Sequence, residues 1–223
     1  MKKKAFFFFV FAILLFSSAF IHNTKKNNLT KKAATQITEE NNFELQPNMN
    51  FLRAGQLLND VLKEKEDNHI IVQAKDFTIT QHEANIKYVY YKSNESTNPM
   101  QDAIDECIRL ETLYCEAVKK GFDVSDEEVS STVNTIKQSI SDSNDNNIKS
   151  YLSKFDNEED YWNYEKTIVR YNMIIQKYLT NHRLTFFKEH NFDDSQESQN
   201  AWLDAEKKLE KELIKKQKPQ FLN

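Results

Sequence analysis

Glycine and proline are so scarce in this sequence that they limit the folds it can adopt. Only two glycines (Gly55 and Gly121) and three prolines occur among the 223 residues, against average usages of about 7% and 5%. Gly-rich phosphate-binding loops, dinucleotide-binding turns and nucleophile elbows need clustered glycines, and β-sandwiches or barrels need many tight turns. Because charged residues make up a further 29% of the chain, the sequence predicts a mainly α-helical protein.

Apolar residues that recur at helical spacing predict five helices. They cover approximately residues 51–62, 98–120, 125–140, 156–182 and 195–216. Gly121 stands where a left-handed residue commonly ends a helix. Ser125 and Glu128 form the capping-box pattern that begins the next helix. The polar stretch 141–147 predicts a solvated loop.

The folded body is expected to span residues 49–217. Besides the helices it contains two short β-prone runs, 70–72 and 77–79, which predict a two-stranded ribbon too brief to anchor a sheet domain. Residues 218–223 include Pro219, which discourages continuation of the last helix, and are expected to form a tail.

A sustained heptad pattern marks the helix at 156–182, which Asp156 and Glu159 open with a loose capping-box pattern. Its positions alternate three and four residues apart, at Tyr161, Tyr164, Ile168, Tyr171, Ile175, Tyr178 and His182. Tyrosines in such a seam offer apolar ring faces with polar tips. Two interpretations stay open. The seam is either ordinary core or a partly exposed face that binds polypeptide, with Tyr161, Tyr164, Ile168, Tyr171, Ile175 and Tyr178 as the candidate residues.

The N-terminal residues have the pattern of an export signal. Three lysines precede an apolar run (5–21), and Ser17 and Ala19 have the small side chains of a cleavage site. The run is also long enough to span a bilayer core of about 30 Å. Residues 1–21 are therefore expected to be a signal peptide cleaved after Ala19 or a retained membrane anchor, with the body outside the cytoplasm. Residues 22–48 are polar, lack an apolar period and predict a linker.

The charge of the chain is distributed unevenly. The net charge is −4, and residues 1–32 hold seven lysines and no acidic residue, which leaves −11 on the rest. Nucleic-acid-binding proteins carry clustered basic residues on the binding face. We therefore expect no nucleic-acid partner.

Side chains that commonly carry chemistry show no diagnostic arrangement. Cys107 and Cys115 lie on one predicted helix about 12 Å apart by helical rise, whereas a disulfide needs Cα atoms within about 7 Å, so both are expected to be buried small hydrophobes. The five histidines lack metal-binding spacing, and the acidic runs lie at predicted helix N-termini, where they complement the helix dipole. We expect no catalytic, cofactor or metal site.

One stretch, 103–129, combines several features in a fixed order. A Leu/Ile-rich helix ends in Glu116-Ala117, and Lys119-Lys120-Gly121-Phe122 and then Val124-Ser125-Asp126-Glu127-Glu128-Val129 follow. This order resembles the N-terminal chaperone module of SurA- and PrsA-type extracytoplasmic foldases. Residues 70–83 are similar to the strand and the Ile-Thr-x-x-Glu helix start of that family, with Lys75-Asp76 near the usual Asn-Gly turn. Residues 155–179 and 202–216 are similar to its long helix and its returning C-terminal helix.

The resemblance implies a helical module, a short ribbon and a returning helix, and it implies binding of unfolded or exported polypeptides outside the cytoplasm of a bacterial cell. Family members usually carry a parvulin prolyl-isomerase domain of roughly one hundred residues between the long and the returning helix. The interval 179–202 in this chain is too short to hold such a domain. Isomerase activity, and enzyme activity in general, is therefore expected to be absent.

Three functional hypotheses remain after the sequence analysis. The preferred one is an ATP-independent, extracytoplasmic chaperone-like protein, secreted or membrane-anchored, that binds unfolded polypeptides through an apolar, tyrosine-lined groove. The second is a membrane-tethered adaptor that binds one folded partner through the seam at 161–178. The third is a peptidyl-prolyl isomerase or another enzyme whose site the sequence does not reveal.

Overall fold

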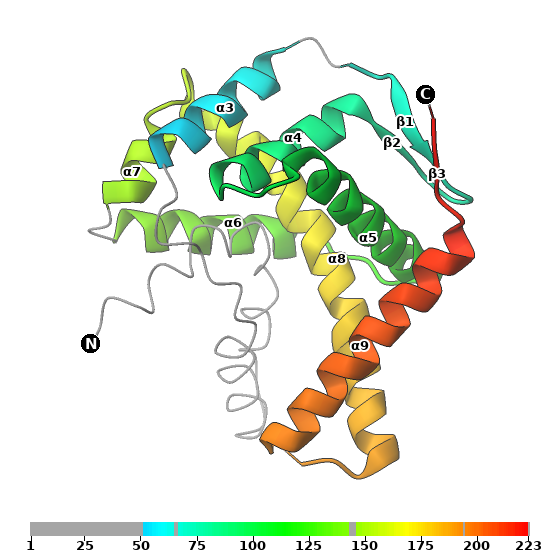
Figure 1. The fold of residues 1–223 in the computed structure, drawn as a ribbon. Coiled ribbons are helices and arrows are strands. Elements are labelled where there is room, and N and C mark those ends of the chain that lie inside the picture. Colours follow the sequence, from blue (N-terminus) through cyan, green and yellow to red (C-terminus); the bar gives the residue numbers. More distant parts are fainter. Residues whose placement is uncertain (1–50, 65–66, 143–145, 194, 223) are drawn as a thin grey trace. The chain divides into compact units, whose positions relative to one another are not determined.

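The computed structural model describes residues 51–64, 67–142, 146–193 and 195–222 (Figure 1). In chain order the elements are α3 (Phe51–Lys63), β1 (Ile70–Gln73), β2 (Thr78–Thr80), α4 (Gln81–Ser93), α5 (Pro99–Lys119), α6 (Asp126–Ser141), α7 (Asn146–Leu152), α8 (Glu158–His190), α9 (Gln196–Gln217) and β3 (Gln220–Phe221). The prediction of a mainly α-helical fold is confirmed. The expected signal or anchor at 1–21 and the linker at 22–48 lie outside the described residues. Within the described ranges, none of the helices has both the length and the apolar character needed to cross a membrane.

The chain divides into two compact units, where the sequence predicts one domain over 49–217. The hairpin unit takes the described residues of Phe122–Asn144 and Trp162–Leu203, and so contains α6 and most of α8. The ribbon unit takes those of Gln46–Gly121, Asp145–Tyr161 and Asp204–Asn223. Helices α8 and α9 each begin in one unit and end in the other.

Local capping explains where two of the helices begin. The Ser125 hydroxyl accepts the Glu128 N–H at 3.2 Å, and the Glu128 carboxylate accepts the Ser125 N–H at 2.8 Å, so the predicted capping box at the start of α6 is confirmed. Thr80 and Glu83 form an equivalent box at the start of α4. Gly121 has φ 82° just after α5, as its predicted position at a helix end requires.

The predicted capping box of α8 is wrong. Asp156 forms an ion pair with Lys63 of α3 instead of capping the helix. The Asn157 side chain accepts the Glu159 N–H at 3.0 Å and serves as the cap, one residue later than expected.

The predicted ribbon forms in the ribbon unit, and it gains a strand that the sequence does not predict. β1 pairs antiparallel with β2 on one side and with β3 on the other, in the order β2-β1-β3; Figure 1 shows β3 beside β1. Part of the expected tail at 218–223 is therefore a strand. The buried core of this region joins ribbon residues to α5 and consists of Val72, Ala74, Phe77, Ile79, Cys107 and Ile108, with Ile214 of α9 packed against it.

The end of α9 is bonded to the turn between β1 and β2, within the ribbon unit. The Lys75 N–H donates to the Gln217 carbonyl at 2.9 Å, and the Asp76 N–H donates to Gln217 Oε1 at 3.2 Å. Gln217 Nε2 donates to Asp76 Oδ2 at 2.8 Å, and Lys119 pairs with the same carboxylate. These bonds satisfy the N–H groups of a turn that lacks the usual Asn-Gly sequence.

Helices α3 and α7 approach so closely that Gly55 leaves no room for a side chain. A Cβ at this position would lie 2.4 Å from the Tyr151 carbonyl oxygen and 3.2 Å from Lys154 Cβ. In an open helix, alanine is more stable than glycine by about 0.5–1 kcal/mol. We expect the opposite here, a loss of about 1–3 kcal/mol for Gly55→Ala, because the two helices must separate.

Hydrogen exchange of the α3 and α7 amides in Gly55→Ala measures this loss. Gly121→Ala is the matched control. Nothing lies within 4 Å of the Cβ that this substitution adds, so the only strain on the alanine comes from its φ of 82°. The control is expected to leave protection of α3 and α7 unchanged. Greater protection of those amides in Gly55→Ala would show that the close approach is absent.

Candidate polypeptide-binding site

The six candidate binding residues lie on one long helix, α8, but they do not form one accessible face. Tyr161, Ile175 and Tyr178 are buried. The three between them, Tyr164, Ile168 and Tyr171, are half-buried. Tyr161 belongs to the ribbon unit and the other five belong to the hairpin unit.

The buried residues of the seam pack against aromatic rings of other segments. In the ribbon unit, the Tyr161 ring lies 5.9 Å from the ring of Tyr151 and 5.0 Å from that of Phe155, centroid to centroid. In the hairpin unit, the Tyr178 ring makes edge contacts with Phe122 at 5.7 Å and with His182 at 4.6 Å. Such contacts stabilise beyond the area they bury. Tyr161 and Tyr178 therefore act as core.

The half-buried residues form a short row. Tyr164, Ile168 and Tyr171 are four and three residues apart, which places them on one face of α8 over two turns. We call Tyr164, Ile168 and Tyr171 the α8 stripe. These three of the six candidates keep some exposed surface, and His182, the last position of the seam, is half-buried as well.

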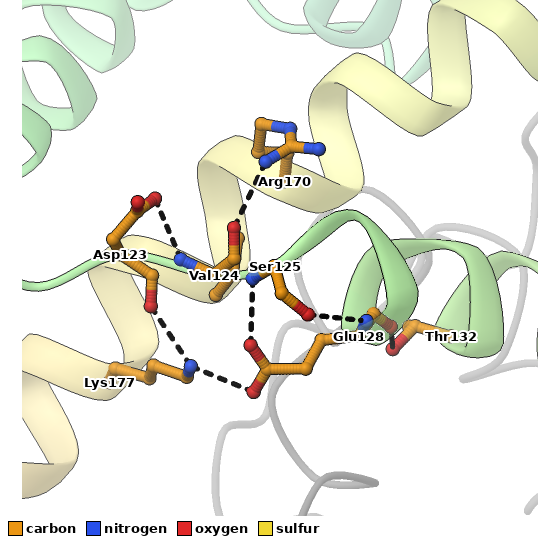
Figure 2. A network of polar contacts seen from close by, with 7 residues as sticks. All are labelled: Asp123, Val124, Ser125, Glu128, Thr132, Arg170 and Lys177. Carbon is orange, nitrogen blue, oxygen red and sulfur yellow. Dashed lines mark hydrogen bonds and ion pairs between the residues drawn. The ribbon is translucent and has the colours of Figure 1, made fainter.

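A polar network beside the stripe fixes α8 to the segment that leads into α6 (Figure 2). Lys177 Nζ donates to the Asp123 carbonyl at 2.9 Å and to Glu128 Oε1 at 2.8 Å. Glu128 thus caps α6 and holds α8 with the same carboxylate. The Thr132 hydroxyl donates to the Glu128 carbonyl at 2.9 Å and continues the network along α6.

Arg170 makes the second attachment, two helical turns before Lys177. Its guanidinium donates to the Val124 carbonyl at 3.0 Å and pairs with Asp126 in the first turn of α6. Figure 2 shows Arg170 and Lys177 extending from α8 toward this one segment. Since Arg170 is adjacent to Tyr171 in sequence, this attachment joins the C-terminal end of the stripe to the segment before α6. The sequence analysis did not identify this role, although the seven-residue spacing of the two cations was visible.

Electrostatics at Glu128 predict how the network responds to acid. The hydrogen bond from Lys177, followed by that from the Ser125 N–H, holds the pKa of the Glu128 carboxyl below its ordinary value. A group with a lowered pKa in the folded state stabilises that state above its unfolded pKa, and the contribution is lost as pH falls through the folded pKa. The free energy of unfolding of the hairpin unit should therefore decrease below about pH 4.5.

We expect Glu128→Gln to be less stable than the parent protein at pH 7 and to approach it in stability as pH falls below about 4.5. Glutamine keeps a capping acceptor and removes only the charge. Tryptophan fluorescence during urea unfolding at each pH measures the difference, since both tryptophans, Trp162 and Trp202, lie in the hairpin unit. A difference that stays constant from pH 7 to pH 3 contradicts the assignment.

A second aromatic group in the hairpin unit was missed by the sequence analysis. It surrounds the turn between α8 and α9. The ring centroid of Phe186 lies 4.2–6.3 Å from the ring centroids of four neighbours, which are Phe187, His190, Phe192 and Trp202. Arg183 lies over the Phe187 ring, with Cζ 5.1 Å from the centroid. The sequence feature that could have revealed this group is the presence of three phenylalanines within residues 186–192. These contacts fix the turn, and Leu184 nearby in sequence is 65% exposed.

Burial raises the pKa of both cysteine thiols. Cys107 and Cys115 are both free thiols, as expected, and burial raises the pKa of Cys107 to about 12, which disfavours the reactive thiolate. Cys107 is buried as predicted, whereas Cys115 is only half-buried, with Sγ 3.8 Å from the Asp76 carbonyl. Across the described ranges, no group of three or more His, Cys, Asp and Glu side chains could hold a metal ion.

Comparison with known proteins adds no relative. No family model, no curated protein and no solved structure matches the chain.

Proposed function

We propose that the protein is an extracytoplasmic, ATP-independent chaperone-like protein that binds unfolded or exported polypeptides. The observation that carries the proposal is the α8 stripe. Its two tyrosines and one isoleucine are half-buried on a helix whose backbone is fixed by Arg170 and Lys177. A fixed, partly exposed aromatic row suits clients of differing sequence, because burial of apolar area is not directional.

The size of the stripe suits weak and reversible binding. Apolar surface that the stripe and a client remove from water contributes about 25 cal/mol per Å². Loss of rotational and translational freedom and ordering of the client offset much of this gain. A site of this size holds a segment briefly and releases it without an energy source.

The order of segments along the chain also supports the proposal. The resemblance to SurA- and PrsA-type foldases implies a returning C-terminal helix, and α9 ends in the ribbon unit with Gln217 bonded to the turn between β1 and β2. Thr80 and Glu83 cap α4, where the family's helix start is expected. The N-terminal apolar run, expected to be an export signal or anchor, agrees with a role outside the cytoplasm.

An aggregation assay tests the proposal. The full chain, inserted in lipid nanodiscs because of residues 5–21, is mixed with a model protein diluted from denaturant, and light scattering is followed without ATP. We expect suppression of scattering at near-stoichiometric ratios, with empty nanodiscs as the control. Scattering equal to that control, with the helical circular dichroism of the protein intact, would overturn the proposal. A single folded partner recovered in pull-down, together with no suppression, would instead favour the adaptor.

A further inference from the structure

β3 covers the outer edge of β1 with few contacts. Its register pairs are Val72 with Phe221 and Gln73 with Gln220, and one further bond runs from the Leu222 N–H to the Ile71 carbonyl at 2.9 Å. β1 has four residues and β3 has two. Two of the four residues of β1 therefore have no register partner in β3.

The side chains of this segment gain little from burial. Phe221 is 57% exposed and Leu222 is 44% exposed. Paired residues of an antiparallel ladder share one face of the sheet, so Phe221 continues the row of Val72 and Ile79, both of which are buried. An apolar side chain thus stands at the rim of the ribbon core without being enclosed by it.

The connection between α9 and β3 consists of a strained residue and a proline. Gln217 is bonded to the turn between β1 and β2, and Lys218 directly after it has φ 50°. A left-handed lysine is strained, and Pro219 has no N–H to donate to a ladder. Residues 220–222 are therefore held mainly by their own few bonds to β1.

We propose that the outer edge of β1 is a strand-exchange site, where an extended apolar segment of a client polypeptide replaces residues 220–222. This inference rests on the proposed function and names a second place of contact for the same clients. An incoming strand can pair along all four residues of β1 and place one apolar side chain where Phe221 now lies. Strand addition gives affinity through main-chain bonds and so accepts many sequences.

Two variants at one position test the exchange. Leu222→Pro removes the N–H that donates to Ile71, whereas Leu222→Ala removes the side chain and keeps that donor. The probe is a reduced, carboxymethylated and permanently unfolded model protein with a fluorophore, titrated with the full chain in nanodiscs. Loss of one backbone hydrogen bond raises the fraction of molecules in which residues 220–222 have left the edge of β1. We therefore expect Leu222→Pro to bind the probe roughly fivefold more tightly. Leu222→Ala should change affinity less than twofold, and deletion of residues 220–223 should match or exceed Leu222→Pro.

Hydrogen exchange of the parent protein supplies a direct readout. Addition of the probe should speed exchange of the Leu222 amide while the β1 amides stay protected. Unchanged exchange at Leu222, or no gain in affinity for both Leu222→Pro and the deletion while the parent protein binds the probe, overturns the exchange and leaves the proposed function standing. If the parent protein and all variants fail to bind the probe, the proposed function fails and the exchange fails with it.

Discussion

Replacing Tyr164 and Tyr171 together with serine is expected to weaken binding of an unfolded client by tenfold or more. Each substitution removes a ring from the accessible part of α8, and about 1.4 kcal/mol of lost burial corresponds to a factor of ten in affinity. Fluorescence anisotropy of a labelled, permanently unfolded model protein measures the change. The helical circular dichroism of the variant should match that of the parent protein.

The control for this loss is Tyr88→Ser. Tyr88 is also half-buried, lies on α4 in the ribbon unit, and loses the same atoms. It should leave client affinity within twofold. Equal losses from Tyr88→Ser and from the double variant would mean that the α8 stripe has no special role.

The largest expected loss of stability follows from Tyr178→Ala. This side chain is 1% exposed and lies against the rings of Phe122 and His182. Deleting a fully buried aromatic ring costs about 3–5 kcal/mol, the sum of lost burial and of the cavity left behind. Urea unfolding followed by tryptophan fluorescence reports the loss, because both tryptophans lie in the hairpin unit.

Tyr171→Ala is the comparison, one heptad earlier on the same helix. Because Tyr171 is only half-buried, we expect its removal to cost less than half as much. Equal losses at the two positions would show that the seam is uniformly core. That result would contradict the assignment of the α8 stripe as partly exposed.

Local sequence patterns predicted where several elements begin and end. Ser125 and Glu128 determine their own cap, and Gly121 tolerates its positive φ, whatever the rest of the chain does. Apolar periodicity likewise predicted α5 and α9 to within about two residues. Such features depend on neighbours a few residues apart, so one sequence contains all the information needed.

Features that join distant segments were not predicted. β3 exists because its two residues meet the edge of β1, about 150 positions earlier, and no alternation in a two-residue strand can reveal it. Gln217 is an ordinary glutamine in the sequence, and only the turn at Lys75 and Asp76 gives it a role. The seven residues of α7 likewise contain too few apolar positions to show a helical period, and α7 occupies the end of the predicted loop.

The division of the seam into core and accessible residues has the same cause. All seven positions share one heptad pattern, and burial depends on which rings lie opposite. Phe122 covers Tyr178, and Tyr151 with Phe155 covers Tyr161. The pattern therefore predicted the helix and its packing face, while the accessible portion could be assigned only from the fold.

Site-specific photo-crosslinking tests the central claim most directly. A photoreactive phenylalanine analogue is placed at Tyr164, at Tyr171 or, as control, at Tyr88, and each protein is irradiated with an unfolded model protein and with the same protein folded. The α8 stripe predicts crosslinks from positions 164 and 171 to the unfolded form alone, with few from position 88. Crosslinks that are equally frequent at all three positions, or absent from 164 and 171 while the client is held in solution, would contradict it.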